Sequence, residues 1–203
     1  MRHSPGAMSR CFHPLLLAAG LLAGGIGLAA PTPASGWWDR LGVRDLDGAP
    51  LAVPGRFIVI VFISPECPVA NAEIPVLNAL AARFGPAGAG FVGVYADPTL
   101  ATAALRRHAA DYHLGFATAD DRAQKLLRTL GATYTPETFV FSADGTLLYR
   151  GRIDDRVEDF GPARVVAAHE DLRDVLAALT AGRPAPFARR PGFGCSIPAP
   201  LPR

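Results

Sequence analysis

Two cysteines, Cys67 and Cys195, are the residues best suited to chemistry outside the N-terminal segment. Cys67 lies in residues 64–68 (Ser-Pro-Glu-Cys-Pro), between an apolar run that predicts a strand and a pattern that predicts a helix. A cysteine at a helix N-terminus has a lowered pKa, because free N–H groups and the helix dipole stabilise its thiolate. The neighbouring Glu66 is expected to oppose this shift. Cys67 is therefore a candidate nucleophile, and the alternative is a buried cysteine that serves as a small apolar side chain.

Cys195 lies in a C-terminal segment, residues 183–203, that holds six of the 19 prolines. This composition predicts an extended, non-helical tail that is long enough to reach Cys67. Three roles for Cys195 remain open. It is a resolving thiol that attacks an oxidised Cys67, a permanent disulfide partner, or a thiol that stays free or pairs with another protein. A permanent bond would close a long loop and stabilise the fold by about 5 kcal/mol in the chain-entropy model.

The elements that must position Cys67 follow from the hydrophobic pattern. Phe57 to Ile63 is an uninterrupted apolar run, typical of a central strand covered on both faces. Residues 68–84 have helical spacing, with Pro68 suited to the first turn and Pro75 expected to kink the helix. Further strands are predicted at residues 91–95, 116–118, 138–142 and 146–150, and further helices at residues 99–113, 120–130 and 169–181.

This alternation predicts an α/β fold with a central mixed β-sheet flanked by helices. The last two strands form an antiparallel hairpin around Asp144-Gly145. We expect one domain over residues 35–182, followed by the proline-rich tail. His108 and His113 are expected on a solvated helix face, and the charged residues between 150 and 156 are expected to form ion pairs.

Composition excludes several classes of protein. Of the 203 residues, 50% are hydrophobic and 19% are charged, which excludes a disordered or coiled-coil protein. A formal net charge of +2 gives no reason to expect a nucleic acid partner. The sequence has no glycine-rich nucleotide loop and no Cys-x-x-Cys-His haem motif, so no cofactor is expected. No metal is expected either; the alternative is a soft-metal site of His169, Cys67 and Cys195.

Residues 1–34 have the layout of a secretory signal peptide. Two arginines precede sixteen apolar residues from Leu15 to Ala30, and small residues and prolines follow. The run is short for a membrane span of about 20 residues. We therefore expect a periplasmic or secreted protein with no stable membrane insertion after signal removal; the alternative is an uncleaved membrane anchor. Removal would discard Cys11 and leave 18 basic and 18 acidic residues in a compartment that permits disulfides.

Several ordered landmarks resemble the thioredoxin superfamily. They are the buried strand, the Cys-Pro turn at residues 67–68, the helix that contains Pro75, and residues 134–140 (Tyr-Thr-Pro-Glu-Thr-Phe-Val). The chain is more closely similar to exported members of the redoxin, or alkyl hydroperoxide reductase/thiol-specific antioxidant, family. The similarity runs from about Val43 to Gly182, and residues 194–197 (Gly-Cys-Ser-Ile) resemble a tail of one bacterial subgroup.

This resemblance implies a thioredoxin-like fold. It also implies that Pro136 is a cis-proline that faces the reactive cysteine. Thr135 and Pro136 would then present backbone groups to a substrate.

The sequence departs from each related motif. Ala70 stands where a Cys-x-x-Cys thioredoxin has its second cysteine, and Asn71 stands where a Cys-x-x-x-Cys copper chaperone has one. A peroxiredoxin has Pro-x-x-x-Thr/Ser-x-x-Cys, of which Ser64 keeps the hydroxyl while Ile60 replaces the proline. Residues 137–138 (Glu-Thr) stand where a peroxide-polarising arginine is expected.

The sequence therefore predicts an exported thiol–disulfide oxidoreductase with Cys67 as nucleophile and Cys195 as resolving thiol. Its expected partners are protein or small-molecule thiols and disulfides and an external reductant. Two alternatives stay open: a thiol peroxidase that reduces hydroperoxides, and a non-catalytic metal-handling or binding module. The predicted substrate-binding residues are Ser64, Pro68, Thr135 and Pro136.

Overall fold

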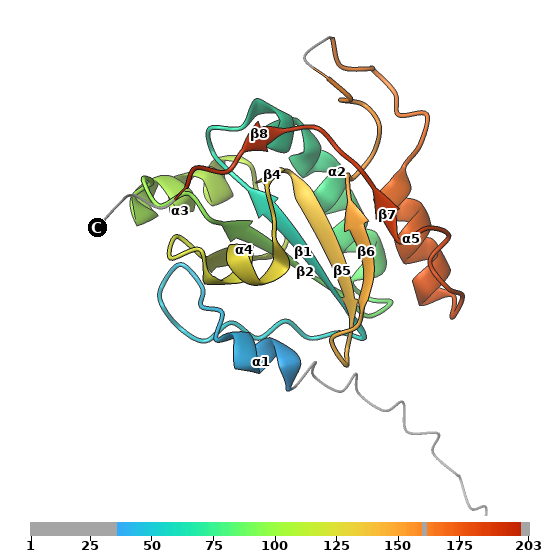
Figure 1. Cartoon of the computed structure of the whole chain (residues 1–203), viewed down its shortest axis with the longest axis horizontal. Helices are drawn as coiled ribbons and strands as arrows, with labels where there is room; N and C mark the ends of the chain where they lie inside the picture. The colour runs from blue at the N-terminus through green and yellow to red at the C-terminus, as the bar shows by residue number, and fades with distance from the viewer. Residues whose placement is uncertain (1–35, 160–161, 200–203) are drawn as a thin grey trace, which may run out of the picture.

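The computed structural model describes residues 36–159 and 162–199, so the predicted signal peptide at residues 1–34 lies outside the described residues. Its main element is a six-stranded mixed sheet in the order β3-β2-β1-β5-β6-β7 (Figure 1). The β1, β2 and β3 strands are parallel, β5 is antiparallel to both β1 and β6, and β7 is parallel to β6. The mixed sheet predicted from the sequence is confirmed. The strands are β1 (Phe57–Ile63), β2 (Ala89–Tyr95), β3 (Ala117–Asp120), β5 (Glu137–Ser142), β6 (Leu147–Gly151) and β7 (Arg189–Arg190).

The central strand β1 separates two hydrophobic clusters, because successive side chains of a strand point to opposite faces. Val59, Val61 and Ile63 join a cluster with α2 (Pro68–Phe84), α5 (Asp171–Thr180) and Leu105 of α3 (Thr102–Asp111). Ile58, Ile60 and Phe62 join a second cluster with Trp38 of α1 (Trp37–Leu41) and Leu126 of α4 (Lys125–Leu130). These six β1 side chains are at most 1% exposed. The end of β1 that leads to Cys67 is therefore held on both faces.

Three helices begin later than their hydrophobic pattern predicts, and hydrogen bonds to a buried aspartate explain each difference. The α3 helix begins at Thr102, because Asp97 accepts hydrogen bonds from the Thr99 N–H (2.9 Å) and hydroxyl (2.7 Å) and holds Thr99 in a turn. The α4 helix begins at Lys125, because Asp121 accepts the N–H groups of Leu126 (2.9 Å) and Leu127 (2.7 Å) and its own carbonyl accepts the Gln124 N–H (2.6 Å) in a turn before the helix. The α5 helix begins at Asp171, because Asp155 accepts the His169 N–H (3.0 Å).

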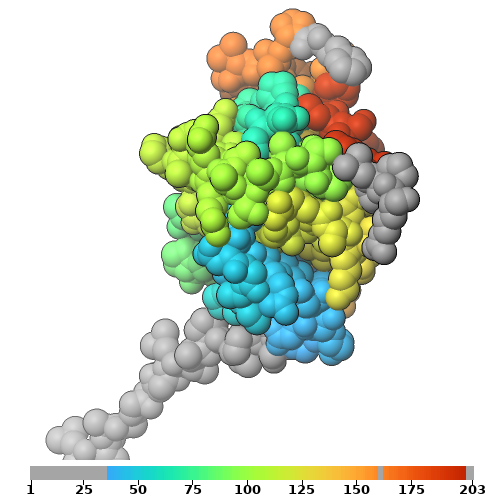
Figure 2. Space-filling view, turned by 90° about the vertical axis from the view of Figure 1, so that its left-hand side faces the viewer, coloured from blue at the N-terminus to red at the C-terminus, as the bar shows by residue number. Residues whose placement is uncertain are grey.

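The tail crosses the domain surface and adds a second, two-stranded sheet. In that sheet β8 (Cys195–Ser196) is antiparallel to β4 (Tyr134–Thr135). In Figure 2 the tail (red) lies at the surface beside the teal segment that carries the first part of α2. Within residues 36–159 and 162–199, no helix combines the length and the apolar character needed to cross a membrane.

Candidate active site

Cys67 lies at the junction between β1 and α2 and is the N-cap residue of α2. Its sulfur accepts a hydrogen bond from the Ala70 N–H at 3.3 Å, and its thiol donates to the Thr135 carbonyl at 3.2 Å. The residue is only 1% exposed. Pro68 is the first residue of the helix, where its missing N–H costs no hydrogen bond. The sulfur of Cys67 is therefore held at the end of the buried central strand by two hydrogen bonds.

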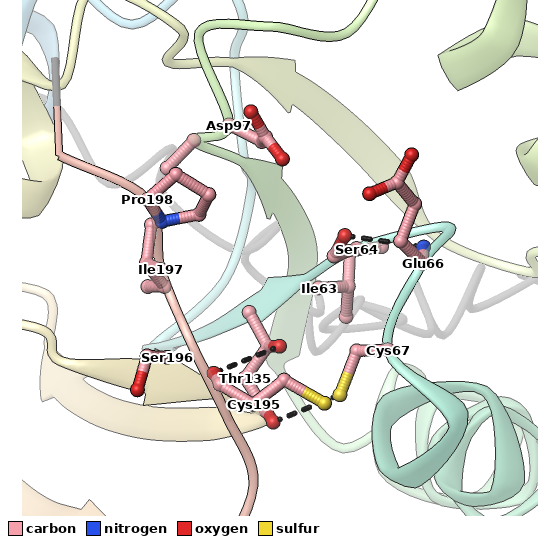
Figure 3. Close-up of a pocket in the computed structure, with 11 residues that line it drawn as sticks. Ile63, Ser64, Glu66, Cys67, Asp97, Thr135, Cys195, Ser196, Ile197 and Pro198 are labelled. Carbon is pink, nitrogen blue, oxygen red and sulfur yellow. Dashed lines mark hydrogen bonds between the residues drawn. The ribbon is translucent and has the colours of Figure 1, made fainter. Parts of the chain in front are cut away.

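The tail places Cys195 directly against Cys67. Cys195 pairs with Thr135 in the β4–β8 ladder, and the Thr135 hydroxyl donates to the Cys195 carbonyl at 3.5 Å. The two sulfur atoms face each other (Figure 3). Both cysteines are free, and the two side chains are hydrogen-bonded. The structure thus brings the predicted pair together in its reduced form.

The surroundings shift the two thiols in opposite directions. Burial opposes ionisation of Cys67, but hydrogen bonds from Cys195, Thr135 and Ala70 outweigh burial and lower its pKa below the ordinary value. Burial, together with the hydrogen bond to Cys67 and the charge of Cys67, raises the pKa of Cys195 to about 11. The Glu66 carboxylate, expected from the sequence to oppose the Cys67 shift, points away from both sulfurs (Figure 3). Cys67 is therefore the more acidic of the two thiols, and Cys195 is the one that holds its proton more tightly.

A pocket of about 160 Å³ opens beside the two sulfurs. The loops after β1 and β2 form one wall and the tail forms the other (Figure 3). The lining residues are Ile63, Ser64, Glu66, Cys67, Ala96, Asp97, Thr135 and residues 195–198.

The four predicted substrate-binding residues lie in three different places. Ser64 and Thr135 line this pocket, and the Ser64 hydroxyl accepts the Glu66 N–H at 3.2 Å. Pro68 is exposed on α2 and does not line the pocket. Pro136 follows a cis peptide bond, as the resemblance predicts, and lines a much smaller cavity with Val69 and Glu73.

A buried charge cluster behind the active-site turn was missed from the sequence. Glu73, on α2, is 4% exposed and pairs with Arg156, which also binds Asp154 with 2.8 Å between Nε and Oδ2. Burial first, and then repulsion by Asp154, raise the pKa of Glu73 to about 7 although Arg156 lowers it. Within residues 150–156 only Arg156 and Asp154 pair with each other. The other charged residues of this segment form ion pairs with residues outside it, such as Arg150 with Glu137 and Arg152 with Asp171. The available signal was a carboxylate at position 73 of the helix, among apolar positions 70, 74 and 77.

His108 is buried, contrary to the prediction of a solvated face. It is 5% exposed, and its ring connects the Tyr95 hydroxyl (2.7 Å) to the Asn71 side-chain carbonyl (2.9 Å). The Asn71 amide donates to the Pro65 carbonyl at 2.9 Å. Burial lowers the pKa of His108, so the ring stays neutral at pH 7. This chain of hydrogen bonds fastens the loop before Cys67 to β2 and α3.

Gln124, which contacts the tail, was also missed from the sequence. It is 1% exposed and adopts a left-handed backbone with φ of 55°. Its amide donates to the Ala96 carbonyl at 2.9 Å and to the Pro198 carbonyl at 2.6 Å. One buried side chain therefore joins the loop after β2 to the tail.

No three His, Cys, Asp or Glu side chains are grouped to hold a metal ion in residues 36–159 and 162–199. His169 therefore does not form the three-ligand site with Cys67 and Cys195 that was the alternative. What the site does offer is a thiolate, a second thiol in contact with it, and a small pocket beside both.

Comparison with known proteins places this geometry among redox proteins. The chain is 27% identical over 109 residues to the thiol-disulfide oxidoreductase ResA of Bacillus thuringiensis (strain Al Hakam), which covers 52% of this chain and 62% of that relative. The match to the ResA of Bacillus anthracis has the same identity and coverage. The chain thus spans less than two thirds of the length of these relatives.

Two solved structures are similar in fold. An uncharacterized conserved protein from Geobacillus kaustophilus has 26% identity and a TM-score of 0.66, over 80% of this chain and 89% of its own. A secreted Mycobacterium tuberculosis disulfide oxidoreductase homologous to E. coli DsbE has 25% identity and a TM-score of 0.51, over 71% of this chain and 98% of its own. These neighbours confirm the thioredoxin-like fold. The model of the AhpC/TSA family matches residues 49–150, half of the sequence, and the chain belongs to that family.

Proposed function

We propose that this protein is a thiol–disulfide oxidoreductase in which Cys67 is the nucleophile and Cys195 is the resolving thiol. The observation that carries the proposal is the contact between two free thiols whose pKa values are shifted in opposite directions at the N-terminus of α2. A thiolate is the reactive form of cysteine, so the lowered pKa of Cys67 selects it as the attacking group.

The reaction runs in two exchange steps. The Cys67 thiolate attacks one sulfur of a substrate disulfide, a Cys67–substrate bond forms, and the other substrate sulfur leaves as a thiolate that takes up a proton. Cys195 then loses its proton and attacks the Cys67 sulfur, which releases the second substrate thiol. The products are a Cys67–Cys195 disulfide and a substrate dithiol, and an external dithiol reduces the protein again.

The environment of Cys195 makes the second step follow the first. Its hydrogen bond to the Cys67 thiolate and the charge of that thiolate both raise its pKa. Both causes disappear once Cys67 is bonded to a substrate, whereas the Val69 N–H that lowers the pKa of Cys195 stays in place. Cys195 therefore ionises more readily when it is needed.

The family and relatives named above support this chemistry, since the ResA proteins are thiol-disulfide oxidoreductases and the mycobacterial neighbour is a secreted disulfide oxidoreductase. We propose export through the segment at residues 1–34 on the same grounds. The domain would then span residues 35–182 and be followed by the tail.

Hydroperoxide reduction is a second candidate function, favoured by Ser64 at the pocket and by the pocket volume of about 160 Å³. Cys67 would attack the terminal peroxide oxygen, the O–O bond would break, and an alcohol or water would leave. Cys195 would attack the resulting sulfenic acid, release water and form the same disulfide.

The test is the count of free thiols by intact mass in reduced protein treated with one equivalent of 2-hydroxyethyl disulfide or of hydrogen peroxide. The wild-type protein should lose two thiols and reopen with a mild dithiol. The Cys195→Ser variant should accumulate a mixed disulfide at Cys67 with the disulfide and a sulfenic acid with peroxide. The matched Arg189→Ala variant should behave as wild type. Wild-type turnover by Cys195→Ser, or a native disulfide that resists mild dithiol, would contradict the resolving role.

A further inference from the structure

Residues 194–198, which we call the strap, lie as an extended strand across Cys67. Cys195 pairs with Thr135 and Ser196 pairs with Tyr134 in antiparallel register. The Ile197 N–H continues the ladder by donating to the Thr133 carbonyl at 3.3 Å. An extended cysteine-bearing segment of another protein would use this same edge to bring its sulfur to Cys67, and an edge pairs with one strand at a time. The strap and such a segment therefore compete for one position.

The close approach of the strap is built into the sequence. A Cβ atom at Gly194 would overlap the Thr135 carbonyl oxygen. A second close contact lies earlier in the tail, at Arg190 of β7. A Cβ atom at Gly151 of β6 would overlap the Arg190 carbonyl. Glycine removes the obstructing side-chain atom at both contacts. The tail path is thus matched to the domain surface at two separate points.

The far end of the strap is held by Gln124 and by apolar packing. The Gln124 amide donates to the Pro198 carbonyl at 2.6 Å, and Ile197 packs against the second hydrophobic cluster. With the strap docked, what remains beside the sulfurs is the pocket of about 160 Å³. That space is large enough for a small disulfide or hydroperoxide, whereas the backbone edge that a polypeptide strand would pair with is occupied by the strap.

We propose that the strap is an internal occupant of a polypeptide-binding groove formed by residues 133–135 and Gln124. With the strap docked, only small molecules reach Cys67; an extended cysteine-bearing polypeptide reaches it after the strap leaves. The sequence of the strap also describes the segment that the groove accepts. It has a glycine before the cysteine and an aliphatic residue two positions after it. The effect on reaction rates rests on the proposed oxidoreductase function, whereas occupancy of the groove rests on geometry alone.

Binding tests occupancy without any redox chemistry. The probe is a fluorescent peptide with the sequence of residues 190–199 that carries Cys195→Ser, and its affinity for the reduced full chain is measured by anisotropy. Gly194→Ala in the protein should raise the affinity at least about tenfold, because a tethered segment competes at millimolar effective concentration. Ile197→Asp should act in the same direction, and Arg189→Ala, an exposed change in the same tail, should have no effect.

A substitution in the groove should change peptide affinity in the opposite direction. In the Gly194→Ala background, Gln124→Met should weaken peptide binding about tenfold, because the peptide loses the donor that held Pro198. If peptide affinity is the same in wild type, Gly194→Ala and Ile197→Asp, or if no variant binds the peptide, the strap does not occupy such a groove.

Rates test the gate on substrate size. The first substrate is the peptide of residues 190–199 with its cysteine in a mixed disulfide with 2-mercaptoethanol. The second is 2-hydroxyethyl disulfide. Attack by Cys67 releases 2-mercaptoethanol from both, so the leaving thiol is the same. Gly194→Ala should raise the ratio of the peptide rate to the small-disulfide rate at least about tenfold. An unchanged ratio despite tighter peptide binding would overturn the gate. Loss of both reactions, with the binding results intact, would instead count against the oxidoreductase function.

Discussion

Cys67 lies between β1 and α2, whose side chains are buried in two hydrophobic clusters. Cys195 lies in a tail segment that is held by a few backbone hydrogen bonds, by Gln124 and by the packing of the partly buried Ile197. The two sulfurs share one site but differ in how firmly each is held. Elements with many buried apolar contacts open only with the whole domain, while segments with few such contacts open locally. A site that joins both kinds of element has one fixed reactant and one detachable reactant.

The strongest test of this comparison is amide hydrogen exchange. The β1 amides should exchange at least about a thousandfold more slowly than the Ile197 N–H, because global opening costs about 5–15 kcal/mol and local release of the strap costs much less. Mass spectrometry on peptides that cover β1 and residues 191–199 measures both. Equal protection of the two regions would show that the tail is as firmly held as the core.

The Arg156→Met variant should weaken the fixed region. It leaves the Glu73 and Asp154 carboxylates buried without their shared cation, so the free energy of unfolding should fall by about 2 kcal/mol. Urea denaturation measures this loss. Arg173→Met, which alters an exposed helical ion pair of Glu170, is the matched control and should cost less than about 1 kcal/mol. Comparable losses in both variants would show that the charge cluster does not support the active-site turn.

The Cys195→Ala variant tests how far Cys195 lowers the pKa of Cys67. It removes a hydrogen bond that lowers the pKa of Cys67, so that pKa should rise and alkylation at a pH below it should slow. The rate of iodoacetamide alkylation as a function of pH measures the change, with Cys67→Ser as the blank. An unchanged pKa would mean that α2 alone sets the acidity of Cys67.

The stability of the fixed region should also depend on pH because of Glu73. Its pKa of about 7 in the folded protein lies above its ordinary value of 4.5, so the folded state binds the proton more tightly. Its contribution to stability is therefore complete below pH 4.5 and is lost as the pH rises through 7. The free energy of unfolding of Glu73→Gln relative to wild type should increase between pH 5 and pH 8. A parallel profile for the two proteins would contradict this; the exposed Glu66→Gln change is the control.

The sequence predicted the parts of the site that depend on local patterns. The apolar run of β1, the proline after Cys67 and the helical spacing of α2 are local signals, and each placed its element correctly. His108, Glu73 and Gln124 were misjudged or missed because their partners lie far away in the sequence. His108 is buried by Tyr95 and Asn71, and Gln124 contacts residue 198. Such contacts arise only when the sheet and the tail are in place.

The pairing of β7 with β6 sets a limit on how far Cys195 can travel. Arg150 and Arg152 donate backbone hydrogen bonds to the carbonyls of Ala188 (2.9 Å) and Arg190 (3.0 Å), so the tail is anchored five residues before Cys195. A fully extended stretch of five residues spans roughly 17 Å. When residues 194–198 are released, they therefore stay tethered to β7, and the Cys195 thiol remains within this distance of its anchor. Because the tethered strap can rebind quickly, a competing polypeptide must stay bound for longer than the strap takes to rebind. This favours partners that also bind the protein at a second site.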